Sequence, residues 1–266
     1  MLNLLFHIQW QLGIAQAVAA ATAAFLVVLA AGRRGIHLES DAAIAMVRGL
    51  VQIVAVGSIL VFLIRGPRWT GIILLVVMIV AAGATSARRA KKIPGAFAVS
   101  AWSIACGAGS IIAVMTLLGV IDSAITSLVP IGSMIIANAM NANGLALNRF
   151  RSDVLAHVGE VETALALGAE ATTSVSPYVQ SSFEASLIPA IDSIRSLGIV
   201  WIPGLMAGML VSGASPIYAS IYQFVTLAMI LAASGLTALI STLLIRSRIF
   251  SPADQLLLRP GASAAV

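Results

Sequence analysis

Long apolar runs constrain this chain more than any other feature of its sequence. A helix that crosses a bilayer needs about 20 mostly apolar residues to span about 30 Å of hydrocarbon. Hydrophobic residues fill 60% of the 266 positions and charged residues only 9%, which is more apolar side chain than one water-facing domain buries. We therefore predict an all-α integral membrane protein with about seven transmembrane helices, in the runs at 8–31, 43–64, 70–87, 97–120, 126–148, 187–212 and 217–245.

The distribution of Lys and Arg predicts the orientation, because basic residues are retained on the cytoplasmic side of a membrane. Two, four, two and three basic residues follow the first, third, fifth and seventh runs, eleven in all, whereas only Arg65 and Arg68 lie on the other side. This pattern predicts an N-terminus outside, a C-terminus in the cytoplasm and a place in the cell inner (cytoplasmic) membrane. The net charge of +5 then reflects topology and contact with membrane lipids, not a nucleic-acid partner.

The only long polar segment lies between the fifth and sixth runs, at residues 149–186. Under the predicted orientation it is cytoplasmic, and it holds most of the chain's capacity to contact a soluble partner. We expect a first short helix at about 153–167, ended by Gly168 in a left-handed conformation. A second helix should begin near Pro177, where Ser174 and Ser176 are typical start signals.

Within this segment, ETALALGA at 162–169 resembles the "EAA" loop of ABC-transporter permeases. In that family the loop forms a coupling helix that docks in a groove of the ATPase subunit. Thr163 stands where the pattern has its first alanine. The resemblance implies a coupling role for Glu160, Glu162, Ala164, Gly168 and Ala169.

Three further segments, in the same order along the chain, resemble the FetB-like ABC transporter permease family, which is linked to iron export and metal homeostasis and has plant aluminium-tolerance relatives. They are RGLVQIVAVGSIL, PIGSMIIANAMNANGLALNRF and SLIPAIDSIRSLGIVWIPGLMAGML. The resemblance implies a single permease domain over 1–266 with a coupling loop at 149–186. It also implies a homodimer of the permease that binds ABC ATPase subunits.

No phosphate-binding loop of the form G-x-x-x-x-G-K-[ST] is present, because the only lysines, Lys91 and Lys92, lack the required glycines. We therefore expect ATP and magnesium to bind a separate ATPase, with no cofactor on this chain. The three histidines and the single Cys106 have no zinc-site spacing and no catalytic partners, so the chain alone is not expected to be an enzyme.

The fifth run carries an amide-rich strip on one helical face, formed by Met134, Asn138, Asn141 and Asn148. Amides inside a membrane must face protein or water, so the strip either joins helices by hydrogen bonds or lines a translocation path. Arg48 and Gln52 lie one turn apart in the second run and also have two interpretations. Either they line a translocation path, or the Arg48 side chain extends to the membrane surface and has a structural role only.

Three features of the sixth run also leave alternatives open. Asp192 either pairs with Arg195, three residues on, or contributes to cation binding. Gly204, Gly208 and Ser212 form a small-residue packing face, within the subunit or between two copies. Methionines here and in the fifth run are soft metal ligands or packing residues, so the metal ligands are left open.

A second class of function is an ion-gradient-driven carrier or channel with a regulatory cytoplasmic loop. Such a protein ordinarily needs acidic or histidine side chains deep in the bilayer to bind protons or sodium. Only Asp192 is placed to serve in this way, so the ABC permease is favoured.

Overall fold

The computed structural model describes residues 9–33, 39–64, 66–67, 69–90 and 93–258, with the side chains of 9, 10 and 60–64 left aside. Two compact units share these residues, one within 1–66 and one within 67–266, and each is considered by itself. In the described ranges the regular structure is entirely helical, and the extended pairing is confined to two isolated bridges. The all-α prediction is therefore confirmed.

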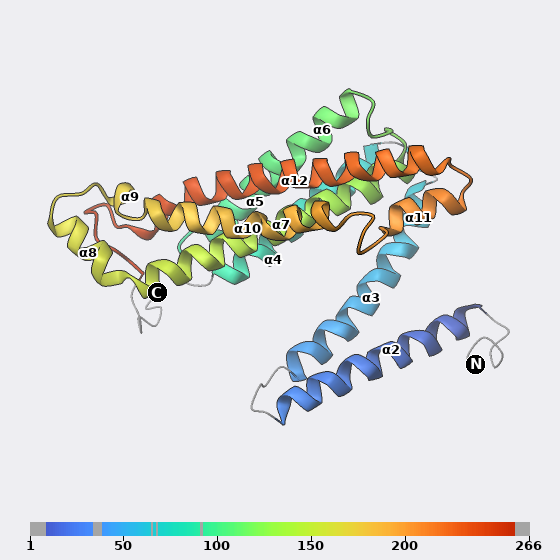
Figure 1. Cartoon of the computed structure of the whole chain (residues 1–266), viewed down its shortest axis with the longest axis horizontal. Helices are drawn as coiled ribbons and strands as arrows, with labels where there is room; N and C mark the ends of the chain where they lie inside the picture. Colours follow the sequence, from blue (N-terminus) through green and yellow to red (C-terminus); the bar gives the residue numbers. More distant parts are fainter. Residues whose placement is uncertain (1–8, 34–38, 65, 68, 91–92, 259–266) are drawn as a thin grey trace. The chain divides into compact units, whose positions relative to one another are not determined.

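The first unit is a pair of long apolar helices, α2(Gln9–Gly32) and α3(Glu39–Ile64) (Figure 1). The two helices contact each other, and a groove between them is lined by small side chains of α2, such as Ala17 and Ala21, and by Val47 and Leu50 of α3. Most of their other described side chains are exposed. Aliphatic side chains in that position suit a surface covered by lipid.

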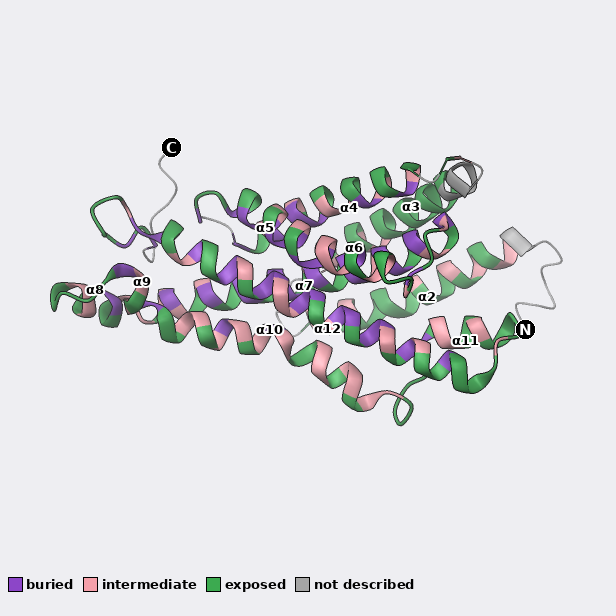
Figure 2. Ribbon diagram, turned by 90° about the horizontal axis from the view of Figure 1, so that it is seen from above, coloured by how far each residue is buried: buried purple, intermediate pink, exposed green. Residues whose placement is uncertain are grey.

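The second unit holds the remaining helices. They are α4(Trp69–Ala87), η1(Arg88–Ala90), α5(Ala96–Ile104), the π-helical turn η2(Ala105–Gly109), α6(Ser110–Leu117), α7(Ile125–Ala156), α8(Val158–Ala166), α9(Ala171–Ser174), α10(Ser176–Ser196), α11(Gly204–Val211), α12(Pro216–Arg246) and η3(Ser247–Ile249). Helices α7, α10 and α12 pack side by side, while α4 packs on α5 and α7 (Figure 1). Buried residues follow the faces that these helices turn to one another (Figure 2).

Two hydrophobic clusters stabilise the second unit. The first lies along its length and joins α4, the α5 to α6 segment, α7 and α12 through residues such as Ile104, Ile135 and Ala233. The second lies at one end, where Phe150 and Val154 of α7 meet Val161 of α8 and Ile245 of α12. The short helices α8 and α9 are thus anchored to the bundle by apolar contacts.

Small residues let the helices approach closely at the α5 to α6 segment. A Cβ added at Gly83 of α4 would lie 2.8 Å from the Cα of Ala101, and one added at Gly107 would collide with Thr237 of α12. Such close backbone approach is typical of membrane helices. The π turn containing Gly107 therefore fits directly against α12.

Six helices in the described ranges are long and apolar enough to cross a membrane, rather than the seven runs predicted. They span Gln11–Gly32, Glu39–Ile59, Trp69–Ala90, Ala96–Leu117, Ile125–Ala156 and Pro216–Ile249. The run at 187–212 is not one helix, because α10 ends at Ser196 and α11 begins at Gly204. The count of seven and the orientation stay predictions.

A tight turn causes this interruption. Gly198 has a positive φ of 74°, and its N–H donates to the carbonyl of Trp201 at 3.1 Å. The indole of Trp201 in turn donates to Ser196 Oγ at 3.1 Å. By contrast Pro189 lies inside the continuous helix α10 and does not end it.

Candidate functional site

Helix α7 carries the polar segment away from the apolar body of the bundle. Its 32 residues make a rod of about 48 Å at 1.5 Å per residue, well beyond the ~30 Å of a bilayer core. The expected helix start at Asp153 is wrong, because α7 continues to Ala156 and the chain turns at His157. An ion pair of 3.1 Å between Arg149 and Asp153, four residues apart, and the buried Val154 hold this last turn in α7.

Helix α8 is short and amphipathic, with one side on the bundle and one side outward. Val161 is buried at its centre, while Glu160 and Glu162 are exposed. Ala164, also predicted as a coupling residue, is half-buried. The fold thus places both glutamates that the sequence predicts for coupling on an outward-facing surface.

A Schellman motif ends α8, as the sequence led us to expect from Gly168. The N–H of Ala169 donates to the carbonyl of Ala164, and that of Gly168 to Leu165, both at 3.0 Å. Gly168 has a φ of 87°, which confirms its left-handed conformation. Leu167, at this cap, is 84% exposed, so a large apolar side chain is displayed beside the acidic face.

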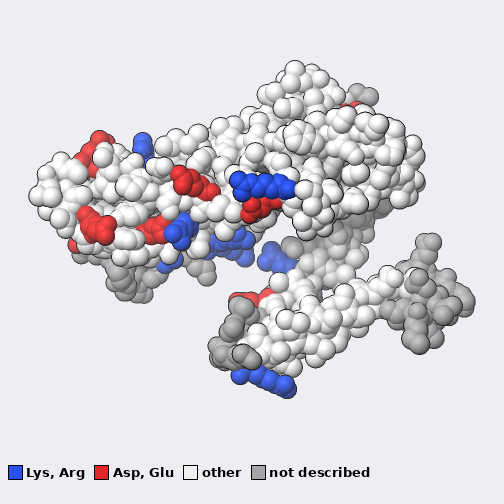
Figure 3. Space-filling model, viewed as in Figure 1, with Lys and Arg blue, Asp and Glu red and all other residues white. Residues whose placement is uncertain are grey.

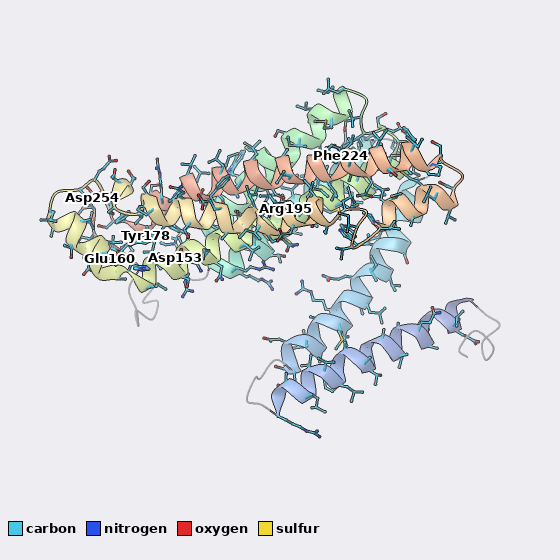
Figure 4. All side chains as sticks on the ribbon, in the orientation of Figure 1. Asp153, Glu160, Tyr178, Arg195, Phe224 and Asp254 are labelled. Atoms are coloured by element: carbon cyan, nitrogen blue, oxygen red, sulfur yellow. The ribbon has the colours of Figure 1, made fainter. Side chains whose placement is uncertain are left out.

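Polar contacts tie α8 to α10, whose start at Ser176 confirms the predicted second helix. The Tyr178 hydroxyl donates to Glu160 Oε2 at 3.0 Å, and the Tyr178 ring stacks on His157 with centroids 5.2 Å apart. Ser181 Oγ donates to Asp153 Oδ2 at 3.2 Å. Figure 4 shows Asp153, Glu160 and Tyr178 together at this end of the bundle.

Partial burial raises the pKa of the Tyr178 hydroxyl, and the hydrogen bond to Glu160 and its charge raise it further. The phenol therefore stays protonated and able to donate at neutral pH. Sequence reasoning missed Asp153, His157 and Tyr178 as a group. The spacing of Arg149 and Asp153 was a readable signal, but nothing in the sequence pairs Tyr178 with Glu160.

A groove of about 730 Å³ runs between the end of α8 and the segment after α12. Glu162, Leu165 and Gly168 line one side, and Asp254 and Leu256 line the other. The tail is held in place by a bridge between Phe250 and Leu256. Figure 3 shows both acidic and basic side chains at this end of the bundle, but the charged residues that line the groove, Glu162 and Asp254, are both acidic, so the groove suits a basic partner surface.

Among the described residues, the amides of the α7 strip make no hydrogen bond to another helix. Asn138, Asn141 and Asn148 are exposed, and Asn138 Nδ2 donates to the carbonyl of Met134 in its own helix at 2.8 Å. The interhelical bond is instead made by the buried Asn143, whose Nδ2 donates to Ser86 Oγ of α4 at 2.7 Å. Asn143 lies outside the strip that the sequence singled out.

Two of the path candidates meet at a small cavity between α7, α10 and α12. Its volume is about 120 Å³, and its lining includes Met134, Asn138, Ser193, Trp201 and Gln223. Gln223 is only 1% exposed, and within the described structure neither Oε1 nor Nε2 has a hydrogen-bond partner. No sequence pattern pointed to Gln223, which is a single amide in an apolar run.

The other candidates lie elsewhere. Arg48 and Gln52 are exposed on α3 in the first unit. The expected pairing of Asp192 with Arg195 is present, at 3.6 Å and on the surface of α10. A Cβ at Gly204 or Gly208 of α11 would meet no described atom within 4 Å, so no tight packing occurs at these glycines in the described chain, and a face between copies stays a prediction.

The fold and its polar end define a multi-pass all-α membrane protein with a short amphipathic helix, α8, exposed at one end of the bundle. The chain belongs to the family described as "Uncharacterised protein family (UPF0014)", which it matches over residues 14–250. No solved structure was found to match it.

Three curated relatives are each 31% identical to this chain. The rice "UPF0014 membrane protein STAR2" aligns over 94% of this chain and 88% of its own length. The corresponding shares are 92% and 90% for the Arabidopsis thaliana "Protein ALUMINUM SENSITIVE 3". They are 86% and 89% for the Escherichia coli K12 "Probable iron export permease protein FetB". The suspected family is confirmed.

Proposed function

We propose that this chain is the membrane-spanning permease subunit of an ATP-binding-cassette transporter that exports metal ions, iron among them. ATP and magnesium bind a separate ATPase, and two permease copies form the membrane part of the complex. The name of the Escherichia coli relative supports the cargo and the direction. The lack of a phosphate-binding loop in this sequence supports a separate ATPase.

The observation that carries the proposal is the construction of α8. A glycine cap ends the helix, so that Leu167 is displayed at the tip with the exposed Glu162 on the same helix. A large exposed apolar side chain on a helix that also presents acidic groups is an anchor that fits a pocket with a basic rim. The anchoring of α8 to α7, α10 and α12 gives a docked ATPase a mechanical connection to the bundle.

The groove between α8 and the 253–256 segment extends this surface. Asp254 adds a carboxylate on the side opposite Glu162. The docking surface of the proposal is therefore α8, its Schellman cap and the tail after α12. Under this proposal the surface faces the cytoplasm, and the protein lies in the inner (cytoplasmic) membrane.

Site-directed cross-linking tests the proposal. A Leu167→Cys variant in a Cys106→Ser background should cross-link to the ATPase that co-purifies with the permease. Leu118→Cys is the matched control, because Leu118 is also exposed and apolar but follows α6, at the other end of the bundle. If neither variant cross-links and vesicles transport metal without ATP, a gradient-driven carrier replaces the ABC permease.

A further inference from the structure

Gln223 of α12 is a buried amide whose hydrogen-bonding capacity is unused among the described residues. Its side chain is almost completely buried, and its amide oxygen and nitrogen both lack a partner among the described residues. A buried amide that loses its hydrogen bonds to water and gains none in the protein destabilises the fold. Such a group is stable in an apolar run only if something in the adjoining cavity satisfies it.

The adjoining cavity limits what that occupant is. Its volume of about 120 Å³ is room for only about four water molecules at ~30 Å³ each. Sites for drug-sized molecules are about 300–1,000 Å³. An organic chelate of a metal is therefore too large for the cavity as it stands, whereas a single ion with part of its water shell fits.

The lining offers neutral ligand atoms. Gln223 contributes an amide oxygen, and Asn138 contributes another, because its Nδ2 is already bonded to the Met134 carbonyl. Ser193 Oγ donates its proton to the carbonyl of Pro189 at 2.8 Å, which leaves its lone pairs to accept or coordinate. Met134 adds a thioether.

This ligand set selects a class of occupant. Amide and hydroxyl oxygens suit divalent cations, and a thioether favours those softer than magnesium or calcium. The lining residues carry no formal charge, so the cation is held weakly and keeps some of its water. Weak holding is what conduction requires, because a cation that binds too tightly does not leave.

We propose that the cavity between α7, α10 and α12 is a transient binding site for a partly hydrated divalent metal cation, with Gln223 as its central contact. Gln223 Oε1 contacts the cation, and Nε2 donates to a water molecule retained in the cavity. The proposal deepens the proposed function, on which its cargo assignment rests. It differs from the amide strip, since Asn141 and Asn148 do not line this cavity.

Trp201 lines the same cavity and provides a built-in reporter. We would purify the whole permease with Trp10, Trp69 and Trp102 changed to phenylalanine, so that emission comes from Trp201 alone. Addition of Mn²⁺, and of Fe²⁺ without oxygen, should quench this emission saturably. Gln223→Leu should weaken the apparent affinity at least tenfold, and Gln223→Glu should strengthen it about tenfold, because a carboxylate attracts a cation that an amide holds weakly.

Gln180→Leu is the matched control, because Gln180 is a glutamine at the far end of α10 that bonds Glu184 and does not line the cavity. It should leave the quenching unchanged. If Gln223→Leu also leaves the quenching unchanged and only raises the melting temperature, the cavity holds water alone and the proposal is wrong. The proposal is equally wrong if neither metal quenches saturably in the parent protein.

This experiment separates the site from the proposed function. The permease is measured without its ATPase, so loss of cross-linking at Leu167 with metal quenching intact would overturn the coupling and leave the site standing. Intact cross-linking with no metal-dependent quenching would overturn the metal site and leave the proposed coupling to the ATPase standing.

Discussion

The hydroxyl of Tyr178 on α10 donates a hydrogen bond of 3.0 Å to Glu160 on α8. The two residues are 18 positions apart in the sequence, and this bond joins the helix proposed to dock the ATPase to a helix that reaches the proposed metal cavity. A push on α8 therefore passes to α10 through a specific contact in addition to apolar packing.

Tyr178→Phe should uncouple the transporter while leaving it folded. The phenylalanine keeps the stacking on His157 but removes the bond to Glu160, which contributes about 0.5–1.5 kcal/mol at a partly exposed site. We expect a several-fold loss of permease-stimulated ATP turnover with a small change in melting temperature. Tyr218→Phe, at an exposed tyrosine of α12, is the control, and equal losses in both variants would contradict the role of Tyr178.

The pKa of Tyr178 should depend on Glu160. Burial, then the hydrogen bond to Glu160 and its charge, raise this pKa above its usual value of 10.0. Because the protonated phenol is the donor, the stability that the bond contributes is complete below pH 10 and is lost as the pH rises through the raised pKa. The pKa of Tyr178 is measured from tyrosinate absorbance, as the difference between each protein and the same protein with Tyr178→Phe. This pKa should be lower in Glu160→Gln, and it should fall by a smaller amount in Asp153→Asn.

Gly168→Pro should abolish coupling. Proline fixes φ near −65°, whereas Gly168 has 87°, and proline also removes the N–H that donates to Leu165. The Schellman motif would be lost and Leu167 displaced, so transport and stimulated ATP turnover should both fall. Gly159→Ala, in the first turn of α8 with open space for a Cβ, should leave both unchanged. Full turnover in Gly168→Pro would remove α8 from the coupling surface.

Cysteine labelling tests the orientation of the second unit. Ser123 and Ser152 are exposed residues that flank the membrane-spanning length of α7 at opposite ends. In a Cys106-free background, an impermeant reagent added to intact cells should label Ser123→Cys and spare Ser152→Cys. Labelling of Ser152→Cys from outside would reverse the predicted orientation.

The buried amide of α7 should matter for stability and the exposed strip should not. Asn143→Leu removes the 2.7 Å bond to Ser86, and bonds of this kind in membrane proteins contribute about 0.6–2 kcal/mol. We expect a lower melting temperature in detergent for Asn143→Leu and an unchanged one for Asn141→Leu. A lower melting temperature in Asn141→Leu, with transport normal per folded molecule, would make the strip a packing face.

Apolar length and local turn chemistry could be predicted from the sequence. The runs that form α7 and α12 could be predicted as helices from their apolar length. Gly168 and Ser176 could be predicted as helix ends, because local backbone geometry favours these residues there. The boundary at His157 could not be predicted, because an ion pair and a buried valine extend α7 into a segment with polar composition.

Contacts between helices determine which amides are buried, and these contacts could not be predicted from the sequence. Pro189 lies inside α10 and Pro203 caps α11, while the break between the two helices is a turn at Gly198, so the positions of the prolines do not show where α10 ends. The asparagine periodicity correctly identified a shared face but not which amides are buried. Asn143 and Gln223 are buried because of the helices that pack against them, which no pattern within one helix reveals.

Helix α10 has the dimensions of a lever. Tyr178 at one end and Ser193 at the other are 15 residues apart, or about 22 Å of helix. A tilt of about 5° over that length would displace the Ser193 end by about 2 Å, comparable to the radius of a water molecule. Pro189 interrupts the helical hydrogen bonds just before that end, so the last turns of α10 are its most pliable part. Under the proposed function, a small rotation of the ATPase would therefore change the volume of the cavity at the far end of α10.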